Sequence, residues 1–101
     1  MTDETSELTI AVEGTTIRAV GEVDYTSSSQ LHRAVDEVLA GGPGTLIDFD
    51  LGGVEFMDSS GLAVLVEAEN RGAHVRVSRA SSPVKLVIEI TGLQHLLWEG
   101  E

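Results

Sequence analysis

The stretch Leu46-Ile47-Asp48-Phe49-Asp50-Leu51-Gly52-Gly53-Val54-Glu55-Phe56-Met57-Asp58-Ser59-Ser60-Gly61-Leu62 decides how this chain folds. Apolar residues alternate with aspartates at its start, and this period of two predicts a strand over 45–50 with one buried face. Gly52-Gly53 is expected to interrupt the strand, and apolar side chains then return to the core at Val54, Phe56 and Met57. Asp58-Ser59-Ser60 is typical of a helix N-terminus, where backbone N–H groups lack helical partners. The stretch therefore predicts a strand, a turn and a helix start that exposes a serine hydroxyl.

Two strands and a helix are expected before this stretch. Alternation predicts a strand over 8–12, Glu13-Gly14 predicts a tight turn, and Thr16 to Val20 predicts an antiparallel second strand that ends before Gly21. Ser27 and Gln30 fit a capping box, in which each side chain accepts a hydrogen bond from the backbone amide of the other residue. A helix follows, and Gly41-Gly42-Pro43-Gly44 ends it. Its apolar residues recur at helical spacing: Leu31, Ala34, Val35, Val38 and Leu39.

Two more helices and one strand are expected after it. The second helix should run from near Ser59 to near Gly72, and 74–77 alternates like a strand. Ser82-Pro83 predicts a third helix with Ser82 as its N-cap. The β-branched residues of 87–90 favour a strand there, but the flanking start and stop signals favour a helix. The apolar tail after Gly92 is expected to form a last strand or a docked end.

This order of elements predicts an α/β fold. Helices that connect strands at short intervals imply parallel pairs, so we expect a mixed β-sheet of four to five strands with about three α-helices packed mainly on one face. The chain has 101 residues, of which 42% are hydrophobic, and this suits one core. A single domain over 1–101 is expected, with residues 1–6 disordered.

Charge and composition exclude several classes of function. The formal net charge is −11, which disfavours binding to nucleic acid or to an anionic membrane surface. A basic protein partner would be attracted by such a charge, although acidity also serves solubility alone. The chain has no cysteine, no apolar run of membrane-spanning length and no signal-peptide pattern at Met1-Thr2-Asp3-Glu4. A cytoplasmic protein is the simplest expectation.

No residues are spaced like a catalytic or metal centre. The three histidines, His32, His74 and His95, lie far apart and are expected to be solvated, so we predict no metal and no cofactor. Asp48 and Asp50 share one strand face, which suits acid–base chemistry or a cation, but solvent exposure at the strand end explains them better. No phosphate loop or nucleophile elbow is present. The sequence therefore predicts no catalytic residue.

The strongest candidate site surrounds Ser59. Helix capping by Asp58 or Ser59, worth about 1 kcal/mol, is a sufficient structural explanation for a serine here. A functional explanation is favoured because small residues keep the helix start open, because three apolar residues lie next to it, and because four acids could surround it. The apolar residues are Met57, Ala63 and Val64, and the acids are Glu22, Asp24, Glu55 and Asp58.

Residues 50–62 also closely resemble the signature of bacterial anti-sigma factor antagonists, the STAS-domain proteins. Gly21-Glu22-Val23-Asp24 is similar to the element at the end of that family's second strand. Ser82-Pro83-Val84-Lys85 with Thr91-Gly92-Leu93 is similar to its last helix. The three matches follow the family's order and cover nearly the whole chain.

The resemblance implies a switch. In that family the serine after the aspartate is phosphorylated by an anti-sigma factor with serine kinase activity, and carried over this is Ser59, with Ser60 as the alternative. The unphosphorylated antagonist binds the anti-sigma factor and frees the sigma factor; the phosphorylated form does not bind, and a PP2C-type serine phosphatase resets it. The resemblance and the neighbourhood of Ser59 together predict these partner-binding residues: Glu22, Asp24, Met57, Asp58, Ser60, Gly61, Ala63 and Val64.

Two alternatives remain open. A related STAS module regulates a membrane transport or lipid-transport complex, and the acidic composition suits that role equally. Gly61 and Gly72 are about four residues closer than expected for the family, close to one helical turn, so the fold should persist with a second helix that is shorter at its far end. A small enzyme is the second alternative, but no base lies beside Ser59 in the sequence.

Overall fold

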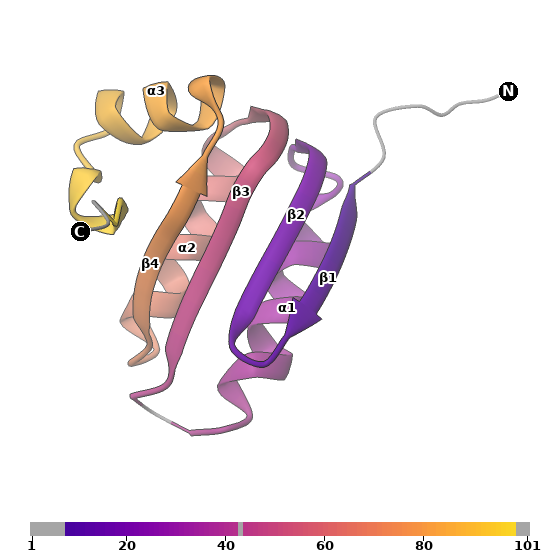
Figure 1. Cartoon of the computed structure of the whole chain (residues 1–101), viewed down its shortest axis with the longest axis vertical. Helices are drawn as coiled ribbons and strands as arrows, with labels where there is room; N and C mark the ends of the chain where they lie inside the picture. The colour runs from indigo at the N-terminus through magenta and orange to yellow at the C-terminus, as the bar shows by residue number, and fades with distance from the viewer. Residues whose placement is uncertain (1–7, 43, 99–101) are drawn as a thin grey trace, which may run out of the picture.

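The computed structural model describes residues 8–42 and 44–98, so the disorder expected over residues 1–6 lies outside the described residues (Figure 1). Four strands, three α-helices and one 3₁₀ helix make up this part of the chain. In order, they are β1 (Thr9–Glu13), β2 (Thr16–Val23), α1 (Ser28–Leu39), β3 (Leu46–Met57), α2 (Ser59–Asn70), β4 (His74–Ala80), α3 (Ser82–Ile90) and η1 (Gln94–Leu96).

The strands form one mixed sheet in the order β1-β2-β3-β4. β1 pairs antiparallel with β2, and the β2–β3 and β3–β4 pairs are parallel. α1 and α2 make the two parallel crossovers and lie on the same face of the sheet, whereas α3 lies at the end of β3 and β4 (Figure 1). The predicted α/β class, mixed sheet and helix placement are therefore confirmed, and the four strands lie within the predicted four to five.

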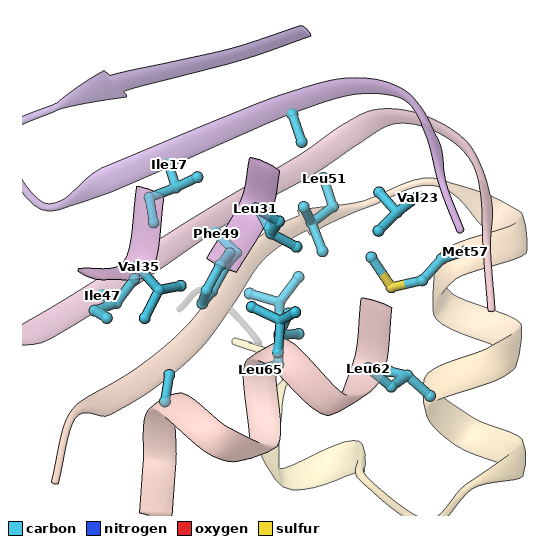
Figure 2. Packing of buried hydrophobic residues seen from close by; sticks show 14 of the residues in the cluster. Ile17, Val23, Leu31, Val35, Ile47, Phe49, Leu51, Met57, Leu62 and Leu65 are labelled. Carbon is cyan, nitrogen blue, oxygen red and sulfur yellow. The ribbon is translucent and has the colours of Figure 1, made fainter. Parts of the chain in front are cut away.

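The core lies between the sheet and the two crossover helices. Ile17, Ile47, Phe49 and Leu51 point from the strands toward Leu31 of α1 and the apolar face of α2 (Figure 2). Further fully buried side chains complete this layer: Val23, Val35, Val54, Leu65, Val77, Val84, Ile88 and Leu96. The opposite face of the sheet carries no helix in the described part of the chain, and its outward side chains are mostly polar.

β3 continues through Gly52-Gly53, where the sequence predicted an interruption. The register with β2 shifts twice, between Arg18 and Val20 and between Gly21 and Glu22, and each shift places one extra residue in β3. Such bulges break the period of two without ending a strand. Buried residues consequently recur at Leu51, Val54 and Met57, and Phe56 is 48% exposed rather than part of the core as predicted.

The predicted capping box at the start of α1 is wrong. Ser27 has helical backbone angles (φ −87°, ψ −14°) and makes no capping bond with its side chain. Its hydroxyl instead accepts from the amide of Asp24 and lies within hydrogen-bonding distance of two acceptors, the carbonyl of Glu22 and the carboxylate of Asp24. Gln30 donates through Nε2 to the carbonyl of Leu8, which links α1 to the start of β1. The polar side chains of this turn therefore stabilise the β2–α1 connection.

The segment Ser82–Ile90 forms helix α3 despite its β-branched residues. Val84 and Ile88 are one turn apart and fully buried, so the segment has an apolar stripe at helical spacing. Ser81, not Ser82, is the N-cap, and its hydroxyl donates to the carbonyl of Val54. The tail forms η1 and then a single parallel bridge between Leu97 and Val77, so it is a docked end.

Candidate functional site

The candidate site lies where the parallel strands β2 and β3 end beside each other. Val23 and Met57 are partners in the ladder, and Asp24 and Asp58 are the residues that follow them. The amide of Asp58 donates to the carbonyl of Val23 at 3.1 Å, which joins the two strand ends. Carboxyl ends of parallel strands are the usual place for ligand sites in open α/β sheets. Two aspartates thus meet at an edge suited to recognition.

Asp58 alone caps α2. Its backbone is extended, with φ −104° and ψ −169°, and its Oδ1 accepts from the amide of Ser60 at 2.8 Å. Ser59 is therefore the first residue of the helix, and its side chain is exposed. Within the described residues, the hydroxyl of Ser59 makes no hydrogen bond. Capping consequently accounts for Asp58, and it leaves the hydroxyl of Ser59 available for chemistry.

Asp24 is held as an anion beside this helix start. The amide of Ser27 donates to Asp24 Oδ1 at 2.9 Å, and the Ser27 hydroxyl lies 3.0 Å from the same oxygen. These hydrogen bonds, the amide first and the hydroxyl second, lower the pKa of Asp24 below its ordinary value of 3.8. Both loops that follow the paired strands thus present a fixed carboxyl group.

Three of the residues predicted to contact a partner are instead packed beneath the site. Met57 and Val64 are only 4% and 6% exposed, and Gly61 is buried. A Cβ atom at Gly61 would lie 2.8 Å from both Met57 Cγ and Val23 Cγ1, and Figure 2 shows these two side chains close together. Gly61 is therefore required for close packing. Among the other predicted contacts, Ala63 is exposed and four are half-buried: Glu22, Asp24, Asp58 and Ser60.

A groove that the sequence did not predict lies between the start of α1 and the first turns of α2. Its volume is about 560 Å³, and it is lined by Tyr25, Thr26, Ser28, Ser29, His32, Arg33 and Val64. Tyr25 directly follows Asp24 and is 83% exposed. An exposed aromatic residue beside a candidate interface is the signal that would have found it, since aromatic side chains are enriched where proteins bind each other. The small exposed part of Val64 faces this groove.

The aspartate pair of β3 is bound by arginines on the open face of the sheet. Asp50 lies 3.3 Å from Arg18 Nε, and Asp48 lies 3.6 Å from Arg76. The pair lies on the open face, as an edge or solvent-facing position predicts, but the side chains of Asp50 and Asp48 are only 16% and 14% exposed beside these arginines. Carboxylates that are neutralised in this way hold the open face together and are poorly placed as a catalytic pair.

Two histidines pair with carboxylates of α2. His32 Nε2 lies 2.9 Å from Glu67 Oε1, and His95 Nε2 lies 3.1 Å from Glu69 Oε1, so these side chains link α1 and η1 to α2 rather than being merely solvated. Over residues 8–42 and 44–98, no three ligand-type side chains are grouped closely enough to hold a metal ion. No helix in the described part of the chain has the length and apolarity needed to cross a membrane.

Solved structures of other proteins share this fold, including the following three. The anti-sigma factor antagonist SpoIIAA in its unphosphorylated form superposes with a TM-score of 0.71, at 20% identity over 94% of this chain and 89% of that one. An anti-sigma factor antagonist from Mycobacterium paratuberculosis gives 0.73, at 23% identity over 93% and 86%. The phosphorylated form of SpoIIAA, a Bacillus cell fate determinant, gives 0.64, at 19% identity over 94% and 92%. At these identities the likeness establishes the fold.

A comparison with curated proteins gave no match. The family model described as "Mlab, STAS domain" matches residues 6–98, which is nearly the whole chain. The signature around Ser59, the mixed sheet and this match agree, and the chain belongs to the STAS domain family.

Proposed function

We propose that this chain is an anti-sigma factor antagonist of the cytoplasm, a binding module rather than an enzyme. Its unphosphorylated form binds an anti-sigma factor with serine kinase activity and so releases the sigma factor. Phosphorylation of Ser59 by that kinase switches binding off, and a PP2C-type serine phosphatase restores it.

The observation that carries this proposal is the division of labour between Asp58 and Ser59. Asp58 makes the capping bond to the amide of Ser60, so the helix does not need the neighbouring hydroxyl. Ser59 is exposed at the first position of α2, where a kinase active site has access to it. Ser60 is half-buried and is the less accessible alternative.

The fold supports the same conclusion. SpoIIAA has been solved in unphosphorylated and phosphorylated forms, and both superpose on this chain over 94% of its length. A fold that persists in both states suits a switch that acts by local charge. The first turn of α2 is well placed for such a charge, because a helix N-terminus stabilises anions through its dipole and free amides.

Electrostatic repulsion is the proposed means of switching. A phosphate on Ser59 adds about −1.5 to −2 charges at neutral pH beside the carboxylates of Asp24 and Asp58. A partner that approaches this edge must then remove water from a strongly hydrated dianion among existing anions, which weakens the complex. The exposed and half-buried residues around Ser59 form the proposed contact surface: Glu22, Asp24, Asp58, Ser60 and Ala63, with Tyr25 at its margin.

Phosphorylation by a candidate kinase tests the proposal. We expect incubation with ATP and a kinase-type anti-sigma factor to add one phosphate to the native chain and to Ser60→Ala, and none to Ser59→Ala, as measured by mass spectrometry. Ser59→Ala should still bind the kinase. Phosphorylation of Ser59→Ala would move the site elsewhere. Failure of every kinase tested, with co-purification in a membrane complex, would support a transport or lipid-transport subunit instead.

A further inference from the structure

A second pocket lies on the open face of the sheet, away from α1 and α2. Its volume is about 300 Å³, and it is lined by Arg18, Val20, Asp50, Gly52, Gly53 and Arg79. Ser59 comes six positions after Gly53 along the chain, which corresponds to roughly 20 Å for an extended segment. The pocket is therefore distinct from the site proposed for phosphorylation.

Two arginines flank the pocket from neighbouring strands. Asp50 is the ladder partner of Arg18 on β2 and of Arg79 on β4, so the three residues form one row across the sheet. Adjacent strands are about 4.8 Å apart, which places the two arginine backbones roughly 10 Å from each other. Two guanidinium groups that reach inward from this distance can contact one small anion from opposite sides.

The one acid in the row is already neutralised. Asp50 Oδ2 lies 3.3 Å from Arg18 Nε, and Asp50 Oδ1 accepts from the amide of Gly52 at 3.2 Å. Asp50 therefore orients Arg18, whose side chain stays 57% exposed and keeps its terminal amino groups available. Arg79 forms no ion pair with any residue over 8–42 and 44–98. The row keeps one net positive charge.

This charge is unusual for the molecule. The chain carries a net charge of −11 and has only six lysines and arginines. Arg18, Arg76 and Arg79 nevertheless gather on β2 and β4, and Arg76 is occupied by Asp48 and by the ring of Trp98, 4.4 Å away. The remaining two guanidinium groups face the pocket. The pocket is therefore a local cationic site on a chain of net negative charge.

The glycines and Val20 shape the floor of the pocket. A Cβ atom at Gly53 would lie 2.9 Å from Val20 Cγ2, and one at Gly52 would fill space 3.5 Å from Arg79 Cβ. No side chain of β3 therefore fills the space between the arginines at these two positions. Val20 is 47% exposed and offers an apolar wall.

The geometry points to a binding site for the phosphate group of a small phosphomonoester, held between Arg18 and Arg79 with its organic part against Val20. Guanidinium groups make paired, charge-assisted hydrogen bonds to phosphate oxygens, and they do so regardless of pH because arginine stays charged. The site binds and does not react. It operates independently of Ser59, so its failure would leave the proposed function untouched.

Titration of the full chain by ¹⁵N-edited NMR tests this site, with phenyl phosphate and inorganic phosphate as probes and sodium chloride at matched ionic strength as the reference. We expect saturable shifts of the Val20, Gly52 and Gly53 amides with both phosphates. Phenyl phosphate should bind a few times more tightly, because its ring contacts Val20. Equal affinity of the two probes would contradict the role of Val20.

Arg79→Gln is the deciding variant, because Arg79 is exposed and its loss leaves no buried partner uncompensated. It should weaken binding about tenfold, the cost of a lost charge-assisted contact. Arg33→Gln removes an exposed arginine of α1 and should bind like the native chain. Linear shifts without saturation, shifts centred on other amides, or equal effects of the two variants would overturn the assignment.

Discussion

Asp24 and Asp58 occupy equivalent places after paired strands, yet they use their carboxyl groups differently. Asp58 accepts from the amide of Ser60 and starts α2, whereas Asp24 accepts from the amide of Ser27 and fixes the β2–α1 turn. Both interactions leave the Ser59 side chain unengaged. The proposal of Ser59 as the phosphoacceptor therefore rests on Asp58 performing the capping.

The pKa of Asp24 gives a prediction at this scale. Its folded-state pKa is depressed, so its stabilising contribution is fully present above the ordinary value of 3.8 and is lost as pH falls through the folded value. Ser27→Ala removes the hydroxyl bond and keeps the amide bond, so the pKa of Asp24 should rise part of the way toward 3.8. NMR titration of the Asp24 carboxyl carbon measures this shift. Ser29→Ala, on the exposed side of α1, should leave it unchanged; an unchanged value in Ser27→Ala would contradict the assigned bonds.

Sequence reasoning located the candidate site but did not predict how its residues are arranged. Asp58 and Ser59 follow from helix-start chemistry, which is local. Tyr25 and the arginine partners of Asp48 and Asp50 were missed, because these contacts join residues on different strands or loops. Burial of Gly61 against Met57 and Val23 likewise depends on how α2 meets the strand ends.

At the scale of elements, the spacing of apolar residues predicted whether a segment is a helix or a strand, but it predicted the length of the segment less well. α1 and α2 were expected close to their observed bounds because apolar spacing and glycine stops coincide. β3 was expected to end at 50, but it reaches Met57 because two bulges change the spacing of its buried residues. A bulge is defined by pairing with another strand, so its signal is absent from a single segment.

The contact between α2 and the strand ends can be tested through Gly61→Ala. The added methyl group lies 2.8 Å from two side chains and forces them apart, while alanine gains helix propensity. We expect a net loss of about 1–2 kcal/mol in the free energy of unfolding, measured with urea. Gly41→Ala is the matched control, since its nearest atoms lie at 3.5 Å, and it should change stability by less than about 0.5 kcal/mol. Equal effects of the two changes would refute tight packing at Gly61.

For the molecule as a whole, topology was predictable because short helical connections require parallel strands on one sheet. The number of strands was predicted as four to five because the tail of the chain has the composition of a strand, but the tail makes only the Leu97–Val77 bridge. The open sheet face follows from helices packed mainly on one face, but the arginines gathered on it were not predicted. Its arginines are dispersed in the sequence, and only the sheet brings them together.

The net charge of −11 gives a prediction for the whole molecule. Repulsion among excess carboxylates destabilises the compact state, and salt screens it. Raising sodium chloride from about 10 mM to about 150 mM shortens the Debye length from about 30 Å to about 8 Å, so the urea midpoint should rise. A falling midpoint would mean that salt weakens the ion pairs more than it relieves repulsion.

The most direct test of the switch compares affinities of the unphosphorylated and Ser59-phosphorylated chain for the kinase-type anti-sigma factor, by calorimetry. The complex is expected to weaken by about tenfold or more on phosphorylation, while circular dichroism stays unchanged because the phosphate is accommodated at the start of α2. Equal affinity of the two forms, or weaker binding accompanied by lost helical signal, would contradict a switch that acts through local charge.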